Sequence, residues 1–195
     1  SISAVLGMTQ PGAAGATAEE FRQVLGNDGS EQAFRAQAEL LRRSYYHVER
    51  RTLSTHSALW VDESLKLNTQ FSAFMQDAYK AKVNRANFRT SSVAARKAIN
   101  HLGRISTYGR IPQLVGKGDV TEETRLVLFN TIFFRAPWAS EFYEDATRPK
   151  KFHRVDGSTT EVPMMFQKSY FGHFRGPGFQ MLSMPYLWGD AEMLV

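Results

Sequence analysis

The stretch RLVLFNTIFFRAPW, residues 125–138, decides how this chain folds. In an extended strand successive side chains point to opposite faces, so Leu128 and Ile132 share one face while Val127 and Phe129 share the other. Both faces are apolar, which predicts a strand that other layers cover on both sides. A helix through the same residues is disfavoured by the β-branched and aromatic content, the short length and the proline near the end.

Asn130 interrupts this apolar set in the middle of the predicted strand. A buried carboxamide that finds no hydrogen-bond partner costs about 1–3 kcal/mol. We therefore expect a group from another element to meet Asn130. The prediction is a central strand with a polar lock at its midpoint.

Length and composition limit the class of protein. A chain of 195 residues forms one large domain or two small ones. No apolar run approaches the ~18–20 residues that cross a membrane, so we predict no membrane partner. The net charge of +5 is spread along the chain without a Lys/Arg block, which favours a solvated basic surface over a polyanion-binding face and predicts no nucleic-acid partner. The absence of cysteine excludes a disulfide framework and thiolate sites.

Helical patterns dominate the first half of the chain and strand patterns the second, which predicts the α+β class. A capping box over residues 17–20 predicts the start of a helix that ends at Gly26. The turn pair Asp156–Gly157 predicts a hairpin. The other expected elements are helices over 1–12, 69–81 and 92–106, and strands over 56–62, 179–186 and 192–195.

The patterns that carry catalysis or metal binding are missing from the sequence. No pair of histidines has the i,i+4 spacing of a helical metal site, and there is no GxSxG nucleophile motif. The segment 116–118 fails both the dinucleotide-binding and the phosphate-loop patterns. We therefore predict that the chain is not an enzyme and has no catalytic residues, cofactor or metal. The histidines are His47, His56, His101, His153 and His173.

The segment NTIFFRAPW, residues 130–138, resembles a serpin pattern: Asn, two variable or apolar residues, an aromatic pair, a basic residue and, three positions later, Trp. This resemblance covers the whole chain and implies one partial serpin domain over 1–195, with helices packed on a large central mixed β-sheet and additional β-sheets. The other matching positions are Ser1–Ser3, Leu6, Met8, Gly12, Ala13, Gly15, Thr17, Ile99, Asn100, Thr107, Gly109–Ile111, Thr147, Phe152, His153, Asp156, Gly157 and 162–165.

The resemblance implies inhibition of a serine protease, with a cysteine protease as the alternative target. In the family's mechanism the protease cleaves an exposed loop, stays attached as an acyl-enzyme and is carried along as the loop inserts into the main sheet. Asn130 would then be a gate lock (the shutter), with Ser1 or Ser3 beneath it. Trp138 would lie at the top of the opening (the breach), unless it is an ordinary core aromatic.

By the same resemblance, we expect that the chain lacks the family's first helix and its reactive loop near the C-terminus. Residues 1–195 alone would then neither inhibit a protease nor stay monomeric. A non-inhibitory serpin (a hormone carrier, storage protein or chaperone) and a truncated product without function stay open as alternatives. We expect a secreted protein, with a cytoplasmic one as the alternative.

Two further expectations come from the resemblance. Arg35, Arg42 and Arg43 lie on what resembles the helix that binds heparin in some serpins, so a glycosaminoglycan partner is a hypothesis, although Glu31 and Glu39 dilute this face.

The second expectation concerns positions where the chain departs from the family. Leu102 and Gly103 stand where serpins usually have Trp and Val, and Gly7 and Pro11 replace small or apolar residues. These departures predict looser packing around the main sheet, unless neighbouring side chains compensate.

Overall fold

The computed structural model describes residues 2–43, 46–48, 51–187, 189 and 191–195. For residues 40–43, 46–48 and 51 it describes the backbone and not the side chains. The chain divides into two compact units, Ser1–Phe134 and Arg135–Val195. The elements of the first unit are α1 (Ile2–Thr9), the 3-10 helix η1 (Gln10–Gly12), α2 (Gly15–Leu25), α3 (Glu31–Arg43), β1 (Tyr46–Val48), β2 (Arg51–Asp62), α4 (Thr69–Tyr79), β3 (Lys82–Ala86), α5 (Phe88–Ser106) and β4 (Leu126–Arg135), whose last residue enters the second unit.

Local signals explain the start of α4 and the end of α2. Asn68 caps α4, because its side chain accepts hydrogen bonds from the backbone N–H groups of Gln70 and Phe71. Gly26 ends α2 in the left-handed conformation, with φ of 63°. The predicted capping box is wrong: α2 begins at Gly15, two residues before Thr17, and no side chain caps it.

The central sheet is mixed, as predicted. Strand β1 pairs antiparallel with β2, and β3 pairs parallel with β2. Strand β4 also pairs with β2 and confirms the strand predicted at residues 125–134. At one end of this pairing the backbone N–H of Asp62 donates to the carbonyl oxygen of Arg125.

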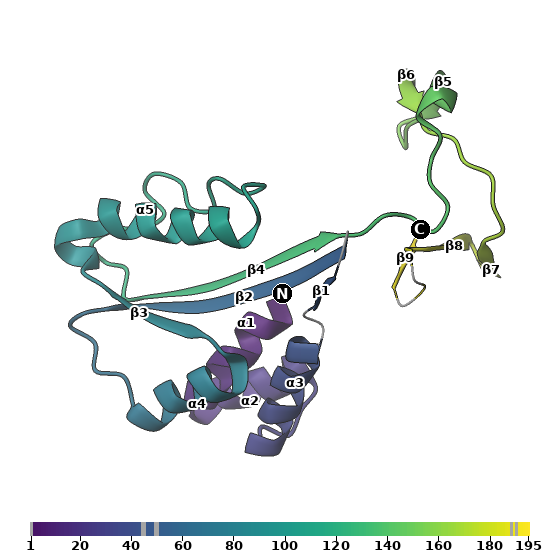
Figure 1. Cartoon of the computed structure of the whole chain (residues 1–195). Coiled ribbons are helices and arrows are strands. Elements are labelled where there is room, and N and C mark those ends of the chain that lie inside the picture. Colours follow the sequence, from purple (N-terminus) through teal and green to yellow (C-terminus); the bar gives the residue numbers. More distant parts are fainter. Residues whose placement is uncertain (1, 44–45, 49–50, 188, 190) are drawn as a thin grey trace. The chain divides into compact units, whose positions relative to one another are not determined.

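Both faces of the sheet are covered, as the two-sided apolar pattern predicted. On one face, α5 lies over β4 and β2, and its Phe88 and Ile99 pack with Ala58 and Phe129 of the strands (Figure 1). This confirms the helix expected over residues 92–106, although α5 begins earlier, at Phe88.

The opposite face is covered by α1 and α4. Met8 and Met75 of these helices pack on Leu59 of β2, and Leu128 of β4 borders the same cluster. Because Leu128 and Phe129 are successive residues, the alternation of the strand divides them between the two cores.

The second unit consists of small antiparallel sheets. Its elements are η2 (Glu144–Ala146), β5 (Arg148–His153), β6 (Thr159–Met164), β7 (Gly172–Gly176), β8 (Phe179–Pro185) and β9 (Glu192–Leu194). The predicted hairpin is present: Gly157 has φ of 82°, and the Asp156 carboxylate accepts a hydrogen bond from the N–H of Ser158 between β5 and β6.

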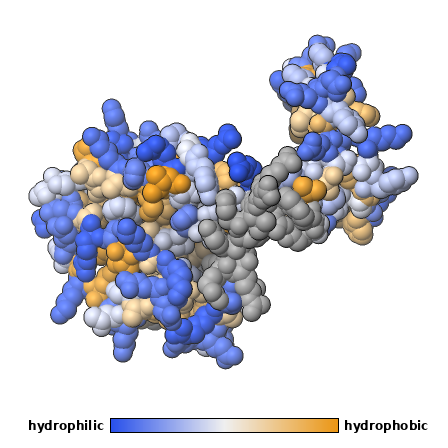
Figure 2. Space-filling model, viewed as in Figure 1, coloured by the Kyte–Doolittle hydropathy of each residue, from blue (hydrophilic) through white to orange (hydrophobic). Residues whose placement is uncertain are grey.

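Apolar side chains also appear on the surface among hydrophilic ones (Figure 2). On β4, Ile132 is 44% exposed and Phe134 39%, so the two-sided covering is complete only in the middle of the strand. Within the described residues, no helix is long and apolar enough to cross a bilayer.

Asp62 fastens the start of α5 to the end of β2. Its carboxylate accepts hydrogen bonds from the N–H of Phe88 at 3.1 Å and from the N–H of Ser64 at 3.0 Å, and also from the Ser64 hydroxyl. The Ser64 hydroxyl is the main cause that lowers the pKa of Asp62, followed by the Ser64 and Phe88 N–H groups. All three donors favour the charged carboxylate.

This arrangement predicts a pH-dependent contribution to stability. Because the folded carboxyl has a lower pKa than the unfolded one, its contribution is complete above the ordinary Asp value and is lost as the pH falls through the folded pKa. We expect Asp62→Asn to be less stable than wild type at pH 7, with the difference shrinking below pH ~4. Urea unfolding across this range measures it, with Glu63→Gln as the exposed neighbouring control. A difference that does not change with pH would contradict the prediction.

Candidate functional site

Asn130 lies in the middle of β4 and is bonded to the neighbouring strand. Its side-chain Nδ2 donates to the Ser57 hydroxyl of β2 at 3.0 Å. Its Oδ1 is buried and has no hydrogen-bond partner among the described residues. The site therefore combines one cross-strand bond with one unsatisfied acceptor, an arrangement that costs free energy in a closed sheet.

The partner observed for Asn130 is not the predicted Ser3. Ser3 is exposed on α1, and its carbonyl accepts a hydrogen bond from Gln37; Ser1 lies outside the described residues. The partner is Ser57, which the sequence reasoning missed. The pairing register of β2 and β4 would have identified this partner. Asp62 of β2 lies opposite Arg125 at the start of β4. Counting five residues back along β2 and five residues forward along the antiparallel β4 places Ser57 opposite Asn130.

Thr131, the next residue of β4, is hydrogen-bonded to α5, which covers the other face of the sheet. Thr131 and Ser106 are both buried, and the Thr131 hydroxyl donates to the Ser106 hydroxyl at 2.8 Å. Ser106 is the last residue of α5. The centre of β4 is thus tied to β2 on one face of the sheet and to α5 on the other.

We expect Asn130→Ala to lower the free energy of unfolding by about 1–2 kcal/mol, because one hydrogen bond is lost while an already unsatisfied acceptor is removed. The double-mutant cycle with Ser57→Ala should give a coupling energy of about 0.5–1.5 kcal/mol. Urea unfolding of the four proteins in the cycle measures both quantities. Strictly additive losses would show that the bond between these side chains carries no stability.

One edge of β4 has no strand partner in the described part of the chain. The sheet order places β2 as the strand that pairs with β4. A strand edge without a partner presents unpaired N–H and C=O groups, to which another strand can be added. The lock residue Asn130 therefore lies on a strand whose described partner is β2.

Trp138 lies in the second unit. Its ring stacks on Tyr186 with 4.5 Å between ring centroids and contacts Phe142 edge to face at 6.2 Å. The backbones of Trp138 and Tyr186 also form an isolated β-bridge. Trp138 is half-buried in an aromatic cluster, and its role as the breach residue stays a prediction.

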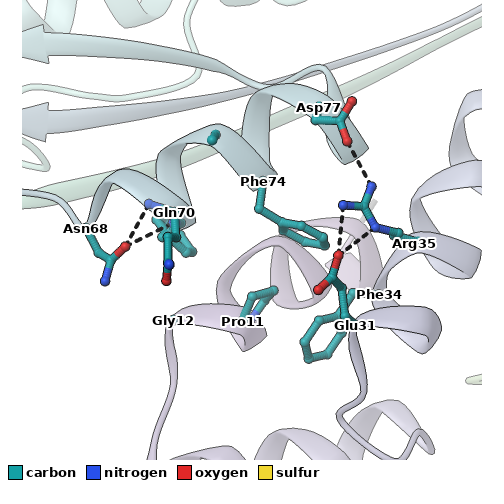
Figure 3. A pocket seen from close by; sticks show the side chains of 11 residues that line it. Pro11, Gly12, Glu31, Phe34, Arg35, Asn68, Gln70, Phe74 and Asp77 are labelled. Carbon is teal, nitrogen blue, oxygen red and sulfur yellow. Dashed lines mark hydrogen bonds and ion pairs between the residues drawn. The ribbon is translucent and has the colours of Figure 1, made fainter.

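Arg35 is held by two carboxylates beside a cavity of about 770 Å³ between α3 and α4. Figure 3 shows its guanidinium between Glu31 and Asp77, and the closest N–O distance to each is 2.8 Å. The hydrogen bonds to Asp77 and Glu31 raise the pKa of Arg35. Its charge is therefore offset locally, and the side chains of Arg42 and Arg43 lie outside the described residues. Glycosaminoglycan binding by this face stays a prediction.

Two of the departures from the family pattern are filled by neighbours. A Cβ on Gly103 would lie 2.4 Å from Cδ1 of Leu114, so the leucine occupies the space of the missing side chain. A Cβ on Gly7 would lie 2.1 Å from Oε1 of Gln37. At these two positions a neighbouring side chain stands where the missing side chain would be. Pro11 lies in the first turn of η1, where a missing N–H is tolerated.

Titratable side chains do not gather into a metal site in the part of the chain that the structure covers. No group of three or more His, Cys, Asp or Glu residues there is placed to hold an ion.

Comparison with known proteins gives a consistent result. The family model described as Serpin (serine protease inhibitor) matches residues 1–195. Mouse antithrombin-III is 32% identical over 202 residues, covering 100% of this chain and 43% of that protein. The chain spans about half the length of the curated relatives it matches.

Solved structures agree. An Arabidopsis serpin, AtSerpin1, in its native stressed conformation superimposes with a TM-score of 0.88 at 28% identity, covering 97% of this chain and 49% of that one. Emu ovalbumin superimposes with a TM-score of 0.94 at 24% identity, covering 100% of this chain and 55% of that one. The chain, with a partial serpin fold built around β4, belongs to the serpin family.

Proposed function

We propose that this chain is the sheet-opening part of a serpin that inhibits a serine endopeptidase by loop insertion. The observation that carries the proposal is the state of β4. Its described partner is β2, and its midpoint holds the Asn130–Ser57 bond beside an unsatisfied acceptor.

The physical logic is strand addition. A loop that enters the sheet as a new strand gains a ladder of backbone hydrogen bonds and buries alternate side chains. This gain must exceed the cost of opening the sheet. A buried acceptor without a partner makes the starting state less favourable, so it favours a sheet that changes its arrangement.

The partner in this proposal is a serine protease, with a cysteine protease as the alternative. It would be captured through a loop that we place outside the present 195 residues. We further propose that the whole protein is secreted and is not itself an enzyme.

A non-inhibitory serpin is the second candidate. The specific observation that favours it is the overlap with emu ovalbumin, which shows that this architecture is shared with a protein not named as an inhibitor. The two candidates differ in the state that the protein reaches once its loop is cleaved.

The test incubates the full-length protein with trypsin, chymotrypsin and elastase in turn. An inhibitor forms a complex with at least one of them that survives boiling in SDS, and its cleaved form melts at a higher temperature than the intact form. Cleavage by all three without a complex and without a gain in melting temperature would reject inhibition of these protease classes and favour the non-inhibitory candidate.

A further inference from the structure

A second cavity, of about 620 Å³, lies between the first turns of α5 and the loop that leads to β4. It is separate from the centre of β4 and from the cavity beside Arg35. Its volume falls in the range of ~300–1,000 Å³ that small-molecule sites occupy. The polar side chains that line it and matter here are Arg89, Thr90, Ser92, Arg96, Lys117 and Thr121.

The lining is strongly cationic. The lining contains three cations and one carboxylate: Arg89, Arg96, Lys117 and Glu122. Throughout the described part of the chain, none of these three cations takes part in an ion pair, whereas Arg22 and Arg35 each hold a carboxylate.

Arg96 is half-buried, while Arg89 and Lys117 are exposed. A partly buried guanidinium has lost part of its hydration, so an anionic ligand gains more from it than from a fully exposed one. The cavity lining therefore has an excess of positive charge that favours an anionic ligand.

The loop side of the cavity is held in place. The Asn100 side chain accepts hydrogen bonds from the N–H groups of Leu114 and Val115, at 2.8 and 2.9 Å. Asp119 then accepts from the N–H of Gly116 at 2.7 Å and closes the turn that contains Lys117. These bonds fix the backbone of the turn that contains Lys117 relative to α5, so the loop itself needs little ordering when a ligand binds.

The two arginines come from the first part of α5. Arg89 lies before a kink at Ser91, where φ is −139° and ψ is 35°, and Arg96 lies after it; both line the same cavity, so both can reach one ligand. Arginine presents a planar fork that matches tetrahedral oxyanions, and the hydroxyls of Thr90, Ser92 and Thr121 can donate further hydrogen bonds. The donor set suits a phosphate or sulfate group, whose several oxygens can accept from more than one of these donors.

We propose that this cavity binds a compact polyanion that carries two or more phosphate or sulfate groups. Phosphate and sulfate esters share the recognised chemistry, namely tetrahedral oxyanions within reach of three cations. The ligand would contact both α5 and the loop before β4. Its binding would therefore hold α5 and this loop together on the face of the sheet that they cover.

The experiment measures binding of inorganic triphosphate and, separately, of sucrose octasulfate to the full-length protein by calorimetry at low and at physiological salt. Arg96→Gln should weaken binding at least about tenfold, which corresponds to the loss of one charge-assisted contact. The matched control is Lys97→Gln, which removes the same charge from the next residue of α5, outside the cavity lining, and should change affinity less than about twofold. Arg96→Lys keeps the charge, removes the fork and should fall between the two.

Binding of triphosphate alone identifies the phosphate ester as the ligand class, binding of octasulfate alone identifies the sulfate ester, and binding of both supports the shared chemistry. Melting curves check that each variant is folded, and Arg96→Lys covers the case in which Arg96→Gln is not. The proposal is overturned if neither probe binds at low salt. It is also overturned if Arg96→Gln and Lys97→Gln weaken binding equally, because a diffuse basic surface would then explain the affinity.

Discussion

We expect the Phe129→Ala variant to lose about 3–5 kcal/mol of the free energy of unfolding, the largest effect of any substitution considered for β4. Phe129 is 4% exposed and lies in the cluster formed by Phe88 and Ile99 of α5 and Ala58 of β2. Its removal subtracts the transfer free energy of the ring and leaves a cavity between helix and sheet, which rigid elements on both sides cannot close.

The matched control for this prediction is Ile132→Ala in the same strand. Ile132 is 44% exposed, so much of its surface is already in water, and its replacement should cost less than about 1.5 kcal/mol. Urea unfolding, monitored by circular dichroism, compares the two variants with wild type. Equal losses would mean that the interface between α5 and the sheet is not the stabilising core of this unit.

The strand that carries Phe129 was predictable because its signal is local. A run of β-branched and aromatic residues with both faces apolar predicts a covered strand, and the structure places α5 on one face and α1 with α4 on the other. The hairpin at Asp156–Gly157 was predictable for the same reason, because the turn residues themselves determine the backbone.

The partner of Asn130 was not found because it depends on a pairing that is not local. Ser57 and Asn130 are 73 residues apart, and the register of β2 against β4 brings them together. The need for a partner could be predicted from the burial of a carboxamide, but the identity of that partner required the register.

The cationic cavity was missed for a related reason. In the sequence, Arg89, Arg96 and Lys117 read as scattered charge without a block. They meet because the Asn100 side chain holds the loop before β4 against α5, and Lys117 belongs to that loop. Arg35 is the opposite case. From the sequence its guanidinium looked free to bind a polyanion, but in the fold it forms ion pairs with Glu31 and Asp77.

After Phe129, Asn100 is the residue whose replacement should lower the free energy of unfolding most. Its Oδ1 accepts from the N–H groups of Leu114 and Val115, and its Nδ2 donates to the carbonyl of Val115 at 2.9 Å. Leu114 is exposed, so water can replace its bond, whereas both backbone groups of half-buried Val115 would lose their partner. We expect Asn100→Ala to lower the free energy of unfolding by about 2–4 kcal/mol.

The loss should also release Leu114, whose side chain fills the space beside Gly103 in α5, so the loop would leave the helix as a unit. Urea unfolding measures the stability, and protease digestion reports whether residues 107–121 become accessible before the rest of the chain. Lys97→Ala, at an exposed position of the same helix, is the control and should change stability by less than about 0.5 kcal/mol. If Asn100→Ala behaves like this control and the loop stays resistant, the side chain does not fasten the loop to α5, and the placement of Lys117 must then depend on the turn closed by Asp119.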